Sequence, residues 1–244
     1  MKNWKLVIEY DGTEFAGWQI QPGRATVQGA LAGAIAQMSG DEVIVHGAGR
    51  TDAGVHAEAQ VASFRTRSRI GAVNWLRGLN SLTPEGLSVR SVEEVAEDFD
   101  ASRSARGKVY RYELRMGDAP PALERKRSWW YRWDLDVAAM KAAARTFLGR
   151  HDYRAFQGAD SPRKTTVRSV FLVDVQDAPG RVSIRVGGGG FLYRMVRNIV
   201  GTLVEVGAGK RRGDSIAALL MGTERRLAGP TAPPEGLYLE RVIY

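Results

Sequence analysis

Residues 49 to 57 read GRTDAGVHA and carry the side chains whose types and spacing best suit chemistry. One carboxylate, Asp52, lies between Gly49 and Gly54, and a cation, Arg50, precedes it by two positions. Glycine permits positive φ and close approach of a substrate to the backbone, so the pattern indicates a rigid loop that presents a single carboxylate. The plainer alternative is an Asx turn beside a solvated arginine, because isolated loop aspartates are common.

The side chains that the sequence lacks narrow the chemistry. There are no cysteines, which excludes disulfides, thiol nucleophiles, zinc knuckles and iron–sulfur clusters. The three histidines, His46, His56 and His151, are too scattered to predict a metal site. We therefore expect no metal and no cofactor.

Charge and hydropathy bear on the partner and the compartment. The sequence has 35 Lys and Arg against 27 Asp and Glu, a formal charge of +8. A polyanion such as nucleic acid fits this balance, although an ordinary basic surface fits it as well. The apolar run near the N-terminus meets Glu9 and Asp11, unlike a signal peptide, and no stretch approaches the roughly 18 apolar residues that a membrane span needs. We expect a cytoplasmic protein that contacts no membrane.

Local periodicity predicts the elements that position the Asp52 loop. Apolar residues from Val27 to Met38 recur at helical spacing between a capping Thr26 and a terminating Gly40, which predicts a helix. Strands at 42–46 and 59–66 should flank the loop. The other expected elements are helices at 70–79, 136–148, 191–206 and 215–221, and strands at 5–10, 87–95, 108–114, 167–175, 182–186 and 237–243.

Strands and helices alternate in both halves of the chain, but several strands are consecutive. This order favours an α+β fold over a doubly wound parallel sheet. We expect two α/β-sandwich-like halves, ferredoxin-like repeats with mixed or antiparallel sheets flanked by helices, and an active-site cleft between them. The polar, small and basic segment 99–107 predicts the boundary, which gives an N-terminal domain 1–105 with the Asp52 loop and a C-terminal domain 106–244.

Five segments form a longer pattern: YDGTEFAGWQ at 10–19, GRTDAGVHA at 49–57, KVYRY at 108–112, FLYRMVRNIVGTLVEVGAGK at 191–210 and TAPPEGLYL at 231–239. In this order, over nearly the whole chain, they resemble the TruA family of tRNA pseudouridine synthases. A lone Arg-Thr-Asp would carry little weight, whereas five long motifs in register are specific. The chain departs from the family pattern at Ser102-Arg103, where Arg-Phe is more usual, and at Arg194, where histidine is frequent.

The resemblance implies an isomerase that converts uridine to pseudouridine at nucleotides 38 to 40 of the tRNA anticodon stem-loop. It implies three catalytic residues: Asp52 as nucleophile, Tyr110 as an aromatic that stacks on the target base, and Arg197 as the cation that pairs with Asp52. The reaction breaks the N1–C1′ bond, turns the base and joins C5 to C1′, so it needs no redox step and no group donor. Asp52 can attack C6 of the base or C1′ of the sugar, and the sequence favours neither route. A homodimer that cradles one tRNA across both subunits is also implied.

Basic residues near these motifs are candidates for RNA contact, namely Arg50, Arg24, Arg106 and Lys108. Arg50 lies only two residues before Asp52, which suits a residue that helps to displace the target base. The loop SPRKTT at 161–166 is a further candidate. His56 is interpreted as structural, because the reaction does not require it.

Two other functions stay open at this point. One is a non-catalytic RNA-binding clamp with the same basic surface, and the other is a pseudouridine synthase that acts on a different RNA. Asp52 argues against the clamp, since a clamp gains nothing from a carboxylate held among phosphates.

Overall fold

The chain forms two compact units. The structure is a computed structural model that describes residues 1–159 and 165–244. Unit 1 consists of Met1–Arg106 together with Tyr238–Tyr244, and unit 2 of Gly107–Leu237. The domain ranges 1–105 and 106–244 stay a prediction. The units differ from those ranges at the C-terminus. Tyr238–Tyr244 belong to unit 1, where Tyr238 and Leu239 pair with His56 and Ala57.

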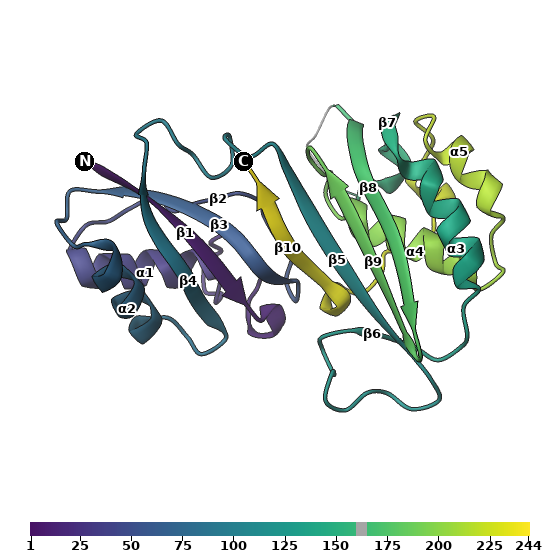
Figure 1. Cartoon of the computed structure of the whole chain (residues 1–244), viewed down its shortest axis with the longest axis horizontal. Coiled ribbons are helices and arrows are strands. Elements are labelled where there is room, and N and C mark those ends of the chain that lie inside the picture. The colour runs from purple at the N-terminus through teal and green to yellow at the C-terminus, as the bar shows by residue number, and fades with distance from the viewer. Residues whose placement is uncertain (160–164) are drawn as a thin grey trace. The chain divides into compact units, whose positions relative to one another are not determined.

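Unit 1 is built on a mixed sheet with the strand order β4-β1-β3-β10, and β2 pairs with β3. The strands are β1 (Lys2–Tyr10), β2 (His46–Gly47), β3 (His56–Thr66), β4 (Leu87–Val95) and β10 (Leu237–Ile243). Neighbours are antiparallel except β10, which runs parallel to β3. Two helices, α1 (Val27–Ser39) and α2 (Ala72–Leu82), belong to this unit (Figure 1).

Sequence-local signals explain the helices and strands of unit 1. Thr26 caps α1 by accepting a hydrogen bond from Gly29 N at 3.2 Å, and Gly40 ends it in the left-handed region at φ 73°, as predicted. Alternate residues of β1 are buried. Trp75 of α2 is fully buried and packs edge-on against Phe64 of β3, with ring centroids 5.3 Å apart. The core of unit 1 therefore lies between the sheet and its helices.

The strands of unit 2 pair in the order β5-β9-β8-β7, and β6 runs parallel to β5. Its strands are β5 (Gly107–Met116), β6 (Trp129–Tyr131), β7 (Gly149–Asp152), β8 (Val167–Ala178) and β9 (Arg181–Gly188). Its helices are α3 (Val137–Ala144), α4 (Met195–Gly207) and α5 (Ile216–Leu219), which Figure 1 shows gathered on one side of the sheet. The expected α+β architecture with mixed sheets flanked by helices is confirmed.

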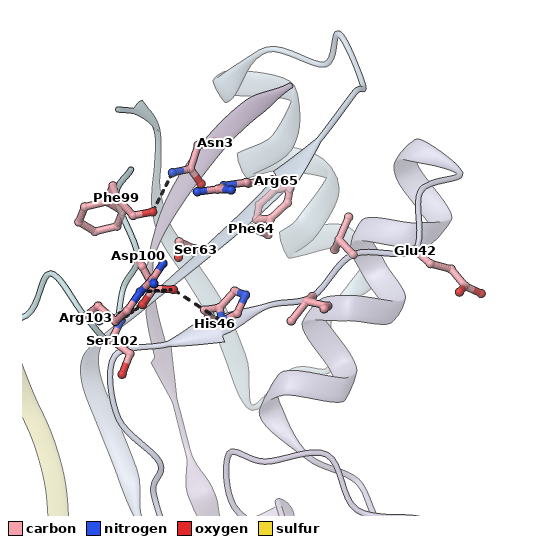
Figure 2. A pocket seen from close by; sticks show the side chains of 12 residues that line it. Asn3, Glu42, His46, Ser63, Phe64, Arg65, Phe99, Asp100, Ser102 and Arg103 are labelled. Carbon is pink, nitrogen blue, oxygen red and sulfur yellow. Dashed lines mark hydrogen bonds and ion pairs between the residues drawn. The ribbon is translucent and has the colours of Figure 1, made fainter. Parts of the chain in front are cut away.

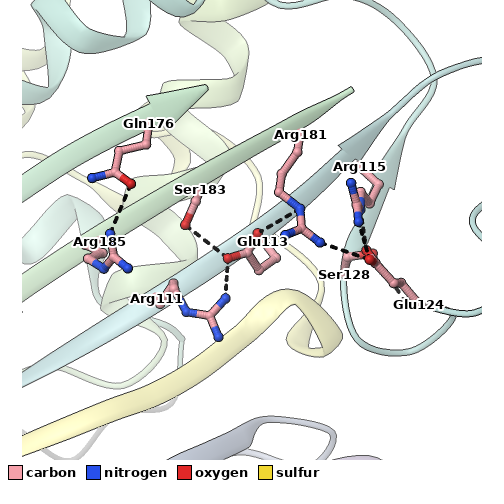
Figure 3. Close-up of polar contacts among 9 residues, drawn as sticks. All are labelled: Arg111, Glu113, Arg115, Glu124, Ser128, Gln176, Arg181, Ser183 and Arg185. Carbon is pink, nitrogen blue, oxygen red and sulfur yellow. Dashed lines mark hydrogen bonds and ion pairs between the residues drawn. The ribbon is translucent and has the colours of Figure 1, made fainter. Parts of the chain in front are cut away.

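Charged residues on β5 and β9 form a network with the loop that follows β5 (Figure 3). Glu113 accepts a hydrogen bond from Arg111 and lies 3.8 Å from Arg181 Nε. Glu124 accepts from Arg115, and from Arg181 at 2.9 Å. The hydrogen bond from Arg115 is the main cause that lowers the pKa of the Glu124 carboxyl. These arginines already have carboxylate partners, so we do not count them among the RNA contacts.

Two predicted elements are corrected. The strand expected at 42–46 is wrong, because only His46–Gly47 pairs with β3. Side chains bind the preceding segment instead: Gln28 Nε2 donates to Val45 O at 2.9 Å, and Asp41 accepts from Arg67 N at 3.1 Å. The helix expected from residue 191 begins only at Met195.

Candidate functional site

Asp52 lies at the start of a tight turn that leads into β3. Val55 N donates to Asp52 O at 3.1 Å, and Gly54 has a φ of 79°. Glycine adopts this conformation without steric cost, which is why the turn carries glycine at its third position. Asp52 is half-buried, whereas Thr51 before it is buried. Asp52 is therefore partly accessible in this turn, and the buried Thr51 before it anchors the turn to the protein.

The segment 10–19 packs against this loop and forms hydrogen bonds with Thr51. The Tyr10 hydroxyl is hydrogen-bonded to Thr51 Oγ1 at 2.8 Å, and Trp18 N donates to Thr51 O at 3.1 Å. Gly17 has a φ of 94°, and a Cβ added there would lie 2.6 Å from Thr51 O. Burial raises the pKa of Tyr10 to about 12, so its hydroxyl stays protonated and can keep this hydrogen bond. The first and second motifs are thus one structural assembly around Asp52.

His56 completes this support. Gly12 N donates to His56 Nδ1 at 3.0 Å, so Nδ1 accepts and the neutral ring carries its proton on Nε2. Asp11 Oδ1 lies 3.2 Å from the same Nδ1, but a bond between them would need a proton that the Gly12 contact excludes. The imidazole stacks on Tyr238 of β10 at 4.7 Å between ring centroids. The contacts described for His56 are therefore structural.

Tyr110 and Tyr112 share one face of β5 and are 8% and 0% exposed. Tyr112 is a core side chain, and its hydroxyl donates to Pro233 O at 2.8 Å. Burial first and then the negative charge of Glu235 raise its pKa well above the ordinary value, and Arg197 opposes the rise. The ring of Tyr110 packs edge-to-face on Phe191, with centroids 5.1 Å apart.

Arg197 lies in α4 and is only 9% exposed. Its Nε donates to Ala232 O at 2.7 Å, and Ala232 N donates back to Arg197 O at 3.1 Å. The fourth and fifth motifs therefore meet at this arginine, and the segment from 229 to 232 fixes the direction of its side chain.

The side-chain amide of Asn198, which was not predicted from the sequence, stabilises the contact between Arg197 and Ala232. Asn198 is fully buried; its Oδ1 accepts from Thr231 Oγ1 at 2.6 Å and from Arg225 at 2.9 Å, and its Nδ2 donates to Phe156 O at 2.8 Å. The usable signal was polar residues four apart, Asn198 and Thr202, within an otherwise apolar helix. We interpret Asn198 as a positioning residue for the segment that binds Arg197.

Gly201→Ala tests this packing. A Cβ at Gly201 would lie 1.8 Å from Pro230 O, so helix and segment must separate. We expect the free energy of unfolding to fall by about 1–3 kcal/mol or more. The matched control is Gly33→Ala in α1, where a Cβ meets nothing within 4 Å, and where we expect a gain of about 0.5–1 kcal/mol from helix propensity. Urea unfolding of both variants gives the comparison; equal effects would contradict the packing argument.

The expected catalytic residues are divided between the units: Asp52 belongs to unit 1, and Tyr110 and Arg197 belong to unit 2. Of the expected RNA contacts, Arg24, Arg50 and Arg106 are exposed, and the described residues give their side chains no hydrogen bond or ion pair. Residues 161–164 of the SPRKTT loop lie outside the described residues.

Lys108 differs from the other basic candidates. It is half-buried and lies two residues before Tyr110, on the same face of β5. Burial lowers the pKa of its ammonium group, and within residues 1–159 and 165–244 no carboxylate pairs with it. An anion bound there would oppose this lowering of the pKa and favour the charged form.

A pocket of about 610 Å³ opens elsewhere in unit 1 (Figure 2). Its lining includes Ile44, Arg65 and Phe99, and a weak cluster in which Asp100 lies 3.7 Å from His46 Nδ1 and 3.8 Å from Arg103 Nε. None of the site residues expected from the sequence lines this pocket.

In the described part of the chain no three His, Asp or Glu side chains gather as possible metal ligands. Nor does any described helix have the length and apolarity needed to cross a membrane.

Comparisons with known proteins give a consistent result. A family model described as tRNA pseudouridine synthase matches residues 6–102 and 143–244. A protein named tRNA pseudouridine synthase A 2 from Clostridium perfringens is 44% identical over 244 residues, which is 100% of both chains. Proteins named tRNA pseudouridine synthase A from Geobacter sp. and Myxococcus xanthus are each 45% identical over 100% of this chain and over 99% and 92% of their own lengths. A chain of a solved Cbf5-Nop10-Gar1 complex aligns over 82% of this chain and 45% of that chain, with a TM-score of 0.37 and 16% identity.

Proposed function

Because this chain belongs to the tRNA pseudouridine synthase family and isomerises uridine to pseudouridine in tRNA, we propose that Asp52 is its nucleophile and the anticodon stem-loop its target. The observation that carries the proposal is the support built around the Asp52 turn. Tyr10 and Gly17 contact Thr51 beside the turn, and Gly12 donates to His56, the first residue of the strand that follows it. Such a support is expected where a carboxylate must keep one orientation.

The proposed chemistry uses one residue of unit 1 and two of unit 2. Asp52 attacks C1′ of the sugar as the N1–C1′ bond breaks, or adds to C6 of the base before that bond breaks. The base turns, C5 joins C1′, and the bond to Asp52 breaks, which regenerates the carboxylate. The C5 proton is lost and N1 gains a proton, so the product is an isomer of the substrate. Tyr110 stacks on the base and helps to remove the C5 proton, and Arg197 pairs with the Asp52 carboxylate and orients it.

RNA contact is proposed for the basic candidates. Lys108 is the best supported, because a half-buried ammonium without a described carboxylate partner suits a phosphate near Tyr110. Arg24 and Arg106 are proposed as exposed phosphate contacts, and Arg50 as the residue that helps to displace the base.

The expected repeats, assembly and compartment belong to the same proposal. The order β4-β1-β3 with β2 beside β3 is that of a ferredoxin-like repeat, which supports this interpretation of unit 1. We further propose a homodimer that works in the cytoplasm, where tRNA is modified; light scattering of the free enzyme tests the dimer.

The test of function is incubation with unmodified tRNA transcripts that carry tritium at uracil C5. Isomerisation releases the label, and mapping of the products locates the modified nucleotides. We expect pseudouridine at positions 38 to 40. No release would favour the RNA clamp, and release from a ribosomal fragment but not from tRNA would point to another RNA.

Arg50→Ala tests the displacement role. Flipping costs least where a base is already unpaired, so turnover should fall about tenfold more on a paired stem uridine than on a loop uridine. Single-turnover rates on two stem-loops that differ only in this pairing give the measurement. Arg90→Ala is the control, because Arg90 is an exposed unit 1 arginine in a 3.6 Å ion pair with Glu9. Equal losses on both substrates would remove Arg50 from this role.

A further inference from the structure

Arg194 occupies a backbone conformation that its side chain disfavours. Its φ is 57°, and in the described part of the chain only one other non-glycine residue, Lys126 at 64°, has positive φ. Residues with a Cβ are strained there, and asparagine and glycine are the usual occupants. Leu192 and Met195 on either side are buried, and Met195 N donates to Leu192 O at 3.1 Å. Buried neighbours therefore hold the turn in this conformation.

The Arg194 side chain is exposed and lies against an aromatic ring. Its guanidinium carbon is 4.7 Å from the centroid of Tyr193, which is itself 40% exposed. Gly158 N donates to Tyr193 O at 2.8 Å, and a Cβ at Gly158 would lie 2.8 Å from Cδ1 of the ring. The ring thus packs on bare backbone and supports the cation from one side.

This arrangement leaves the hydrogen-bonding edge of the cation available. A guanidinium has five N–H donors in one plane, and stacking uses none of them. Within residues 1–159 and 165–244, Arg194 has no hydrogen bond or ion pair from its side chain. Stacking on Tyr193 limits the rotamers of the side chain, so a ligand would meet a cation that is already oriented.

We propose that Arg194, supported by Tyr193, is a positioning residue that binds a phosphodiester of the substrate RNA beside the target uridine. The inference rests on the proposed role of Arg197, which lies three residues further along the chain. The planar fork of arginine matches the oxygens of a phosphate bidentately, whereas it suits a neutral partner less well. Strained residues cluster at ligand sites, and within the described residues the Arg194 side chain contacts the Tyr193 ring but makes no hydrogen bond or ion pair.

The decisive variant is Arg194→Asn, because asparagine tolerates the left-handed region and removes the charge. Thermal stability should stay equal or rise, while KM for tRNA rises about tenfold to a hundredfold, the range for charged hydrogen bonds. The kcat should change by less than about threefold. Lys126→Asn makes the same exchange at the other strained position, and should share the stability effect without the change in KM. A structural role alone would move stability and leave KM unchanged.

The phosphate itself is identified with stem-loop RNAs that each carry one neutral methylphosphonate near the target uridine. Binding is measured in the Asp52→Asn background, so that no turnover is needed and failure of the catalytic proposal does not affect the result. The methylphosphonate at one linkage should weaken RNA binding by the protein that keeps Arg194. The same substitution should not weaken RNA binding by Arg194→Asn any further. Tyr193→Phe should bind as the parent does, because the ring is kept. If every linkage weakens both proteins equally, or if Arg194→Asn leaves KM unchanged, the proposal is overturned.

Discussion

Asp52→Asn is expected to reduce tritium release from C5-labelled tRNA to the background level. The substitution keeps the size of the side chain but replaces an anionic nucleophile with a neutral amide. No other acidic residue lies within residues 49 to 57 to replace it. The loss should therefore exceed that of any other single substitution predicted here, and single-turnover assays with excess enzyme are the measurement.

The same variant should still bind tRNA. Removing a negative charge from a surface that meets phosphates should leave affinity equal or slightly higher. Thermal unfolding is followed in parallel, so that an unfolded variant is not mistaken for an inactive one. A folded variant that forms pseudouridine at near wild-type rate would show that Asp52 is not the nucleophile.

Arg197→Ala should lower kcat by roughly a hundredfold or more while tRNA affinity changes little. Its proposed partner is the Asp52 carboxylate rather than the RNA backbone, and loss of one oriented group at a reacting centre has effects of this order. The substitution also leaves Ala232 O without the hydrogen bond that Arg197 Nε donates at 2.7 Å, so some loss of stability is expected. Filter binding and single-turnover rates on the same tRNA separate the two effects.

Two further variants make the Arg197 result specific. Arg197→Lys keeps the positive charge but cannot reproduce the planar hydrogen bonds, so partial activity is expected. Arg226→Ala removes an arginine of unit 2 that is 76% exposed and paired with Glu224, and it should have little effect. A loss of tRNA affinity as large as the loss of kcat would assign Arg197 to RNA binding instead.

Local patterns in the sequence were enough for the elements whose signals are intrinsic to the chain. The helix from Val27 to Ser39 was predicted from its Thr26 cap, its apolar period and Gly40, and the structure confirms all three. The strand Leu87–Val95 was likewise predicted with its bounds. The order of five motifs was enough for the family, because motif identity does not depend on knowing which residues touch.

Contacts between remote segments were decided only by the tertiary structure. Nothing in residues 10–19 alone shows that Tyr10 and Gly17 support the turn at Thr51, forty-one positions beyond Tyr10. The same holds for Ala232, which binds Arg197 across thirty-five positions. Such partners are chosen by packing, which periodicity and capping do not encode.

The start of α4 shows the same limit within one element. Apolar spacing predicted a helix from Phe191, but Arg194 takes the left-handed conformation because buried side chains on either side hold the turn there. The energy that holds a strained residue comes from the tertiary packing of its buried neighbours, so helix propensity alone cannot reveal it. Sequence by itself therefore determined the family and most of the elements, while tertiary packing decided how Asp52 and Arg197 are each held.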